Sequence, residues 1–207
     1  LDKMSDAEKL GKSNFERMVA EGKKYSKAYV FGTGPSIMKA EEFDFSDGFR
    51  IVANTVISDE KIAKHIKPHA IVFGDFVYHI GPSKYAAAFM EQLSAALEAG
   101  MYGIVRMDIM PFMVTHFPKF KKQLVGIPLH YFARPNIPNA ENYFVKLSNN
   151  SLVSYMLPIS SAMVDQIFIL GCDGRDPKDT LIWKHAKTTH FDDKLTALRE
   201  TPPSVFR

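Results

Sequence analysis

The chain has 207 residues, and its 26 Lys and Arg against 23 Asp and Glu give a formal charge of +3. This length fits one domain with an appended segment, and such a chain can bury a core without disulfide or metal staples. Hydrophobic residues at 46% and charged residues at 24% exclude an intrinsically disordered, collagen-like or coiled-coil chain. The charge is small and no run of Lys and Arg exceeds two residues, which argues against a nucleic-acid partner.

The single cysteine, Cys172, cannot form an internal disulfide, which favours a reducing compartment. No signal peptide is visible in the charged N-terminal stretch. The most apolar stretch, residues 152–172, contains Pro158, Asp165 and Gln166 and is a poor membrane span. The sequence therefore predicts a cytoplasmic protein, with the inner face of the membrane as an open alternative.

Short apolar runs alternate with helical patterns along the chain. A helix is expected at residues 5–21, within an N-terminal helical appendage of residues 1–27, and a single domain follows at 28–207. The expected strands are 28–32, 50–54, 70–74, 102–107 and 166–171, and the expected helices are 59–66, 84–98 and 151–164. Because the strand runs are almost continuously apolar, we expect each strand to be covered on both faces. This alternation predicts an α/β fold with a mostly parallel sheet and helices on both faces.

Residues 111–141 carry five of the twelve prolines and permit no assignment of secondary structure. Such an insertion commonly forms a rim or lid over a site, and an irregular connection is the alternative. If exposed, its Phe112, Met113, Phe117 and Phe120 could contact a membrane-borne acceptor or another subunit of a homo-oligomer.

The most informative short motif is Gly32-Thr33-Gly34-Pro35-Ser36, directly after the first expected strand. Glycines let the backbone approach a ligand closely, and the N-terminus of a following helix presents free N–H groups to an anion. Pro35 suits the first turn of that helix, where a missing N–H costs nothing. The motif predicts a phosphate loop, and a tight turn with a helix cap is the alternative.

Two absences narrow the class of ligand. Ile37 stands where the dinucleotide fingerprint needs a third glycine, and the second strand ends in Ala53-Asn54 rather than in an acid. A nicotinamide dehydrogenase is therefore not expected, and the lack of a GxxxxGK[ST] motif excludes a P-loop NTPase. The Asn54 amide can donate and accept hydrogen bonds, which suits a nucleotide, although it can equally turn the chain into the next helix.

Further motifs follow in the second half of the chain. Ser151 begins an expected helix, Gly171-Cys172-Asp173 ends a strand, and His185-Ala186-Lys187 lies downstream. Together with Gly32–Ser36 and Asn54, this ordered set resembles the bacterial sialyltransferases of glycosyltransferase family 42 and the related domain of unknown function 115. The resemblance covers residues 28 to about 200.

The resemblance implies a Rossmann-like domain that transfers a sugar from a CMP-activated donor to a hydroxyl of a glycan acceptor, with no obligatory metal. It implies that His185 is the general base, that Ser151 and Asn54 bind the nucleotide, and that residues 32–36 lie near its phosphate. Asp173 is expected to bind the sugar or the nucleotide, or to cap its loop.

This chain departs from the family pattern at two places. Thr33 replaces an asparagine between the two glycines, and the loop after Asp173 lacks the family's tyrosines, so Arg175 is expected to contact the leaving phosphate.

Two other functions stay open. Some relatives are pterin diphosphokinases that use ATP and Mg²⁺, and a non-catalytic nucleotide-binding module of surface-polysaccharide or flagellar glycosylation is the third reading. His185 with His190, Asp192 and Asp193 matches no compact zinc spacing, so no metal site is expected.

Overall fold

The computed structural model describes residues 2–148, 150–174, 185–189, 191 and 194. Its centre is a six-stranded sheet in the order β5-β4-β3-β2-β1-β8, in which every neighbouring pair is parallel. The strands are β1 (Lys27–Phe31), β2 (Gly48–Ala53), β3 (Ala70–Val72), β4 (Tyr102–Arg106), β5 (Leu124–Ile127) and β8 (Gln166–Leu170). The predicted α/β fold with a parallel sheet is confirmed.

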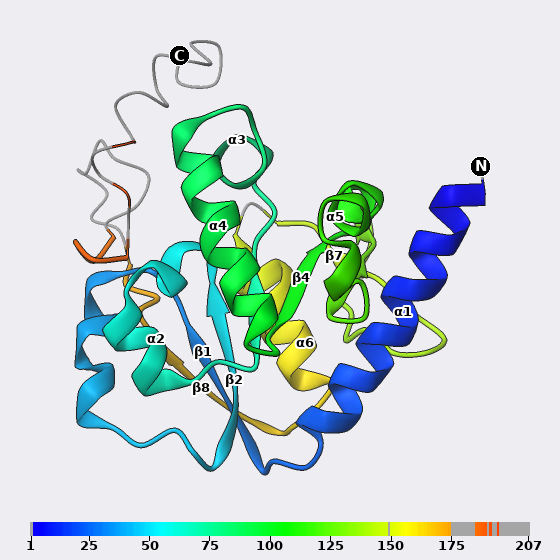
Figure 1. Ribbon diagram of the computed structural model, residues 1–207. Helices are drawn as coiled ribbons and strands as arrows, with labels where there is room; N and C mark the ends of the chain where they lie inside the picture. Colours follow the sequence, from blue (N-terminus) through cyan, green and yellow to red (C-terminus); the bar gives the residue numbers. More distant parts are fainter. Residues whose placement is uncertain (1, 149, 175–184, 190, 192–193, 195–207) are drawn as a thin grey trace.

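Helices cover both faces of the sheet (Figure 1). One face carries η1 (Pro35–Glu42), η2 (Asn54–Ser58), α2 (Glu60–Ile66), α4 (Lys84–Glu98) and α5 (Met110–His116). The other face carries α1 (Asp2–Gly22) and the continuous pair η5 (Leu152–Met156) and α6 (Leu157–Ser161). Shorter elements are α3 (Phe76–His79), η3 (Met107–Ile109), η4 (Pro118–Phe120) and a small second sheet of β6 (Leu129–His130) and β7 (Val145–Lys146). Two apolar cores result, one on each face.

The expected helix starts are set by side-chain caps. Asp59 accepts a hydrogen bond from the Ile62 N–H at 3.0 Å, and Ser83 accepts one from the Ala86 N–H at 3.0 Å. Each cap satisfies a backbone donor that has no partner inside its helix. The expected boundaries at residues 59–66 and 84–98 are thereby confirmed to within one residue.

The structure differs from the sequence prediction in the Pro-rich insertion and in the last helix. Residues 124–127 of the insertion form β5, an edge strand of the main sheet, where no element was assigned. The expected helix at 151–164 begins as the π-helix η5, in which the Leu157 N–H donates to the Leu152 carbonyl. Pro158 follows directly and has no N–H with which to continue the regular ladder.

One burial prediction is wrong. β8 was expected to be covered on both faces, yet Phe168 is 50% exposed and Ile169 is 48% exposed. The reason is position, because β8 is the outermost strand of the sheet. Its sequence is as apolar as that of the inner strands, and composition does not reveal whether a strand has one neighbour or two.

Within the described residues, no helix is both long enough and apolar enough to cross a membrane.

Candidate functional site

The order of the strands reverses between β1 and β8. The chain adds β2, β3, β4 and β5 on one side of β1 and then crosses to place β8 on the other side. In open α/β sheets, ligands bind at the carboxyl ends of the strands that flank such a reversal. Residues 32–36 follow β1 and residues 171–173 follow β8, so two of the predicted motifs meet at this point.

Asp173 is held by the glycine-rich loop. Its Oδ2 accepts hydrogen bonds from the Ser36 N–H at 2.9 Å and from the Ser36 hydroxyl at 3.0 Å. The Ser36 hydroxyl oxygen also accepts a hydrogen bond from the Gly171 N–H at 3.0 Å. A Cβ atom added to Gly34 would lie 2.3 Å from Asp173 Oδ2, so glycine at this position permits the close approach of the carboxylate.

Two backbone N–H groups of the loop, those of Gly34 and Ser36, are already bonded within the chain. The Gly34 N–H donates to the Gly171 carbonyl at 2.7 Å, and the Ser36 N–H donates to Asp173. Pro35 occupies the first turn of η1, as the sequence predicts. The Asp173 carboxylate takes the position at the start of η1 that a phosphate was expected to take. Its other oxygen, Oδ1, has no hydrogen-bond partner among the described residues, which leaves an acceptor for hydroxyl groups.

His185 lies against the same loop. Its Nδ1 is 2.8 Å from Thr33 Oγ1, which is hydrogen-bond distance. The Thr33 carbonyl accepts the Ala186 N–H at 2.8 Å and the Thr189 hydroxyl at 3.0 Å. The loop after β1 thus binds both the histidine and the backbone that carries it.

The segment from His185 to Thr189, here called the His185 segment, is anchored on two further elements. Thr55 in η2 donates its hydroxyl hydrogen to the Thr189 carbonyl at 2.6 Å, and both threonines are buried. The Thr188 hydroxyl lies 3.5 Å from the Met38 sulfur in η1. Sequence reasoning did not single out Thr55 or Thr189. Their position beside Asn54 and beside the His-Ala-Lys motif was the available signal.

Asn54 directly follows β2 and is the first residue of η2, at the same edge of the sheet. Its φ is 48°, a left-handed conformation that asparagine tolerates better than most residues. This conformation turns the chain sharply out of β2 and places Thr55 under the His185 segment. Asn54 therefore turns the chain from β2 into η2, which is the alternative role that the sequence left open.

Ser151 does not take part in the hydrogen bonds that join Thr33, Ser36, Asp173 and His185. It precedes η5 on the other face of the sheet, and the described hydrogen bonds do not link it to residues 32–36, Asp173 or His185. Its side chain does not cap the helix, because the Leu152 N–H donates to the Asn150 side chain at 2.8 Å. The described hydrogen bonds thus join Thr33 to His185 and Ser36 to Asp173, and they do not include Ser151.

The remaining polar candidates divide between two cases. Arg175, His190, Asp192 and Asp193 lie outside the described residues. Cys172 is half-buried behind the loop, and burial raises the pKa of its thiol. In the part of the chain that is described, no group of three His, Cys, Asp or Glu residues lies close enough to hold a metal ion.

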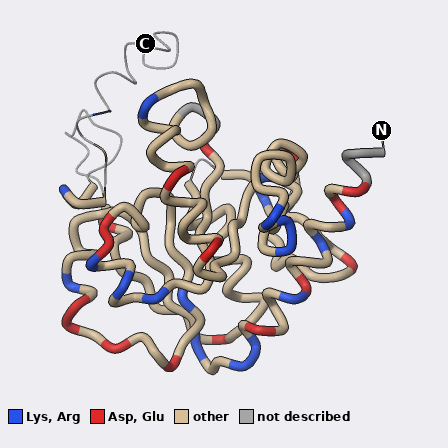
Figure 2. Tube along the Cα trace, in the orientation of Figure 1, with Lys and Arg blue, Asp and Glu red and all other residues tan. Residues whose placement is uncertain are grey.

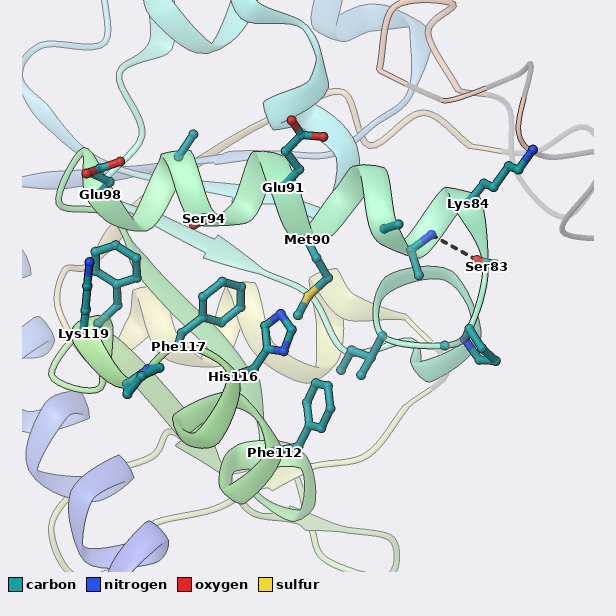
Figure 3. Close-up of a pocket in the computed structure, with 18 residues that line it drawn as sticks. Ser83, Lys84, Met90, Glu91, Ser94, Glu98, Phe112, His116, Phe117 and Lys119 are labelled. Carbon is teal, nitrogen blue, oxygen red and sulfur yellow. Dashed lines mark hydrogen bonds between the residues drawn. The ribbon is translucent and has the colours of Figure 1, made fainter.

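A separate open groove of about 1280 Å³ lies between α4 and the segment of α5 and η4. Figure 3 shows Met90 of α4 pointing toward His116 and Phe112 of α5. Of the four insertion residues expected to contact a membrane or another subunit, Phe112 is 44% exposed, whereas Met113 and Phe117 are buried and Phe120 packs against the core. Thr33, Ser36, Asp173 and His185 do not line this groove.

Charged residues of both signs are spread over the described part of the molecule (Figure 2). Figure 2 shows Lys and Arg interspersed with Asp and Glu along the described chain.

No protein-family model matches the chain, and no curated protein matches it in sequence.

Proposed function

We propose that this protein is a glycosyltransferase of the sialyltransferase type, which moves a sugar from a CMP-activated donor to a hydroxyl of a glycan acceptor. The observation that carries the proposal is the position of His185 Nδ1, 2.8 Å from Thr33 Oγ1 at the reversal of the strand order. A histidine held by a loop at this edge has the position that a general base needs beside a bound substrate.

The Thr33 hydroxyl orients the base in this proposal. If the His185 Nδ1–H donates to Thr33 Oγ1, the lone pair of the neutral imidazole is on Nε2. Nε2 then takes the proton of the acceptor hydroxyl as its oxygen attacks the anomeric carbon. The bond from that carbon to the phosphate oxygen breaks, and the electron pair leaves with CMP. Thr33 is a positioning residue in this step.

The Asp173 carboxylate would bind the donor through hydroxyl groups. Ser36 fixes Oδ2, and the Oδ1 acceptor suits a ribose or sugar hydroxyl better than a phosphate, because two negative groups repel each other. The Asn54 amide lies at the same edge and would contact the nucleotide. The phosphate is then expected beyond the loop amides, with Arg175 as its proposed partner.

The first prediction tests the base. His185→Ala should retain the thermal shift produced by CMP and lose turnover with CMP-sialic acid by about 10²- to 10⁴-fold, the usual effect of removing a positioned base. Thr33→Val should lower turnover and shift its pH profile, whereas Thr33→Ser, which keeps the hydroxyl, should restore both. Near-normal turnover in a folded His185→Ala protein would refute the role of His185.

Thermal-shift and turnover measurements on the wild-type protein distinguish the alternative functions. A strong thermal shift with ATP and Mg²⁺ and none with CMP would replace the transferase by a diphosphokinase. A CMP shift without turnover of any CMP-sugar would indicate a non-catalytic nucleotide-binding module.

A further inference from the structure

β8 has a free edge of backbone hydrogen-bonding groups. Its Leu170 carbonyl accepts the Gly32 N–H, so Leu170, and by alternation Phe168, direct their backbone groups toward β1. The N–H and C=O groups of Ile167 and Ile169 point the opposite way. β8 is the last strand of the sheet, so these outward groups face no strand among the described residues.

At the opposite edge of the sheet, the outward carbonyls of β5 have hydrogen-bond partners. The Asn14 side chain in α1 donates to the outward Leu124 carbonyl of β5 at 2.7 Å, and the Tyr143 hydroxyl donates to the Gly126 carbonyl. A Cβ atom on Gly11 would lie 2.9 Å from that Gly126 carbonyl oxygen, so α1 packs directly against the edge. Side chains and a helix therefore cover β5, while β8 has no such cover in the described chain.

The sequence of β8 favours pairing with another strand. Residues 166–172 contain no charged residue and no proline, which are the usual features that prevent edge strands from associating. An aromatic row runs toward this edge on one face, with ring centroids 5.0 Å apart for Phe45 and Tyr29 and 5.6 Å apart for Tyr29 and Phe168. The row ends at Phe168, which is half exposed.

We propose that β8 pairs antiparallel with β8 of a second copy of this chain, about a twofold axis at Phe168. In this register, the outward groups of Ile167 meet those of Ile169 of the other copy, and both pairs exchange N–H and C=O bonds. Phe168 then lies opposite Phe168 of the second copy, so the aromatic row continues across the twofold axis. A second copy fits because residues 167–169 have the same sequence in both directions, so isoleucine faces isoleucine and phenylalanine faces phenylalanine, while Gln166 faces Leu170. The two sheets would join into one.

The second prediction concerns the mass of the protein in solution. Light scattering after size-exclusion chromatography should give twice the mass of the chain, with dissociation on dilution. Ile169→Lys should give the monomer mass, because a lysine next to the twofold axis is the kind of charge that keeps edge strands from associating. Phe112→Lys is the matched control, since Phe112 is similarly exposed but lies in the α4–α5 groove, and this variant should remain dimeric.

Crosslinking tests the register. In a Cys172→Ser background, Phe168→Cys should form an intermolecular disulfide, because the non-hydrogen-bonded position of an antiparallel pair brings its Cα atoms to about 4.5 Å. Ile167→Cys or Ile169→Cys alone should crosslink poorly, because neither residue faces itself across the axis. Crosslinking at 169 in preference to 168 would contradict the register.

Hydrogen exchange distinguishes a second copy of the chain from another segment of the same chain as the cover of the β8 edge. The Ile167 and Ile169 amides should be protected at high protein concentration and lose protection on dilution. A monomer at all concentrations would overturn the proposal. If its two amides were nevertheless protected, the edge would be covered by another segment of the same chain.

Discussion

His69 and His79 are two histidines whose pKa values are lowered by burial. His69 stacks on Phe49 with ring centroids 4.7 Å apart, and burial together with the nearby Arg50 charge lowers its pKa to about 4. His79 packs against Phe89, and burial lowers its pKa to about 3. The His79 Nδ1 has no hydrogen-bond partner among the described residues. Neither histidine belongs to a sequence motif, so their burial was not foreseen.

The third prediction follows from these two pKa values. Both lie below the value of about 6.5 expected in the unfolded chain, so the unfolded state binds more protons as the pH falls below 6.5. The free energy of unfolding should be highest above pH 6.5 and should fall as the pH drops toward 4 and then 3. His79 alone should contribute a loss of about 2 kcal/mol between pH 6.5 and pH 4.5.

Denaturant unfolding at a series of pH values measures this loss. A His79→Gln variant should show a shallower decline below pH 6.5 than the wild type, whatever its stability at pH 7. An equal decline in both proteins would show that His79 is not buried in its neutral form.

At the scale of elements, the four inner strands and the edge strand β8 were predicted, and the edge strand β5 was not. The runs at residues 28–32, 50–54 and 102–107 became β1, β2 and β4 because almost continuous apolar sequence suits a strand covered on both faces. β5 was missed because it has only four residues and lies between prolines, which are typical of irregular segments. β8 was found, but its exposure was not, since exposure depends on which strands become neighbours.

The fourth prediction concerns the cover that α1 provides for β5. The Asn14 side chain donates to the Leu124 carbonyl at 2.7 Å and to the Lys121 carbonyl at 2.8 Å, and Asn14 is only 1% exposed. Asn14→Leu should lower the free energy of unfolding by about 1 to 3 kcal/mol, because two carbonyls lose their partner in an apolar setting.

Lys12→Ala is the matched control on the same helix. Its ammonium group donates to the Ala140 carbonyl at an exposed position, so its loss should change stability by no more than about 0.5 kcal/mol. Similar melting temperatures for Asn14→Leu and Lys12→Ala would show that the edge contact contributes little.

At the scale of the whole molecule, the candidate site joins segments that are far apart in the sequence. Residues 32–36, Thr55, Asp173 and the His185 segment meet at one edge of the sheet. The sequence predicted that Asp173 and His185 would lie near the glycine loop, since both follow the last strand. It did not predict that the Ser36 N–H would donate to Asp173 and the Gly34 N–H to the Gly171 carbonyl, because a motif's spacing does not show which donors are already bonded.

The fifth prediction tests the anchoring of the His185 segment. Thr55→Val removes the hydroxyl that donates to the buried Thr189 carbonyl, so the free energy of unfolding should fall by about 1 to 3 kcal/mol. The Ala186 amide, which donates to the Thr33 carbonyl, should exchange its hydrogen faster. Thr188→Val, at an exposed position of the same segment, should leave both quantities nearly unchanged. Unchanged exchange at Ala186 in Thr55→Val would mean that Thr55 does not hold the segment.

The pairing of β1 with β8 also has a consequence for the order of folding. Residue 27 pairs with residue 166, whereas β1 to β5 form one block of the sheet in which each strand pairs with the next along the chain. Contacts between nearby segments form sooner than contacts that close a long loop. During synthesis, the glycine loop and Asn54 therefore emerge and can fold well before Asp173 and His185 exist. The candidate site is completed only when β8 docks, so a nascent chain can hold most of its sheet and still lack that site.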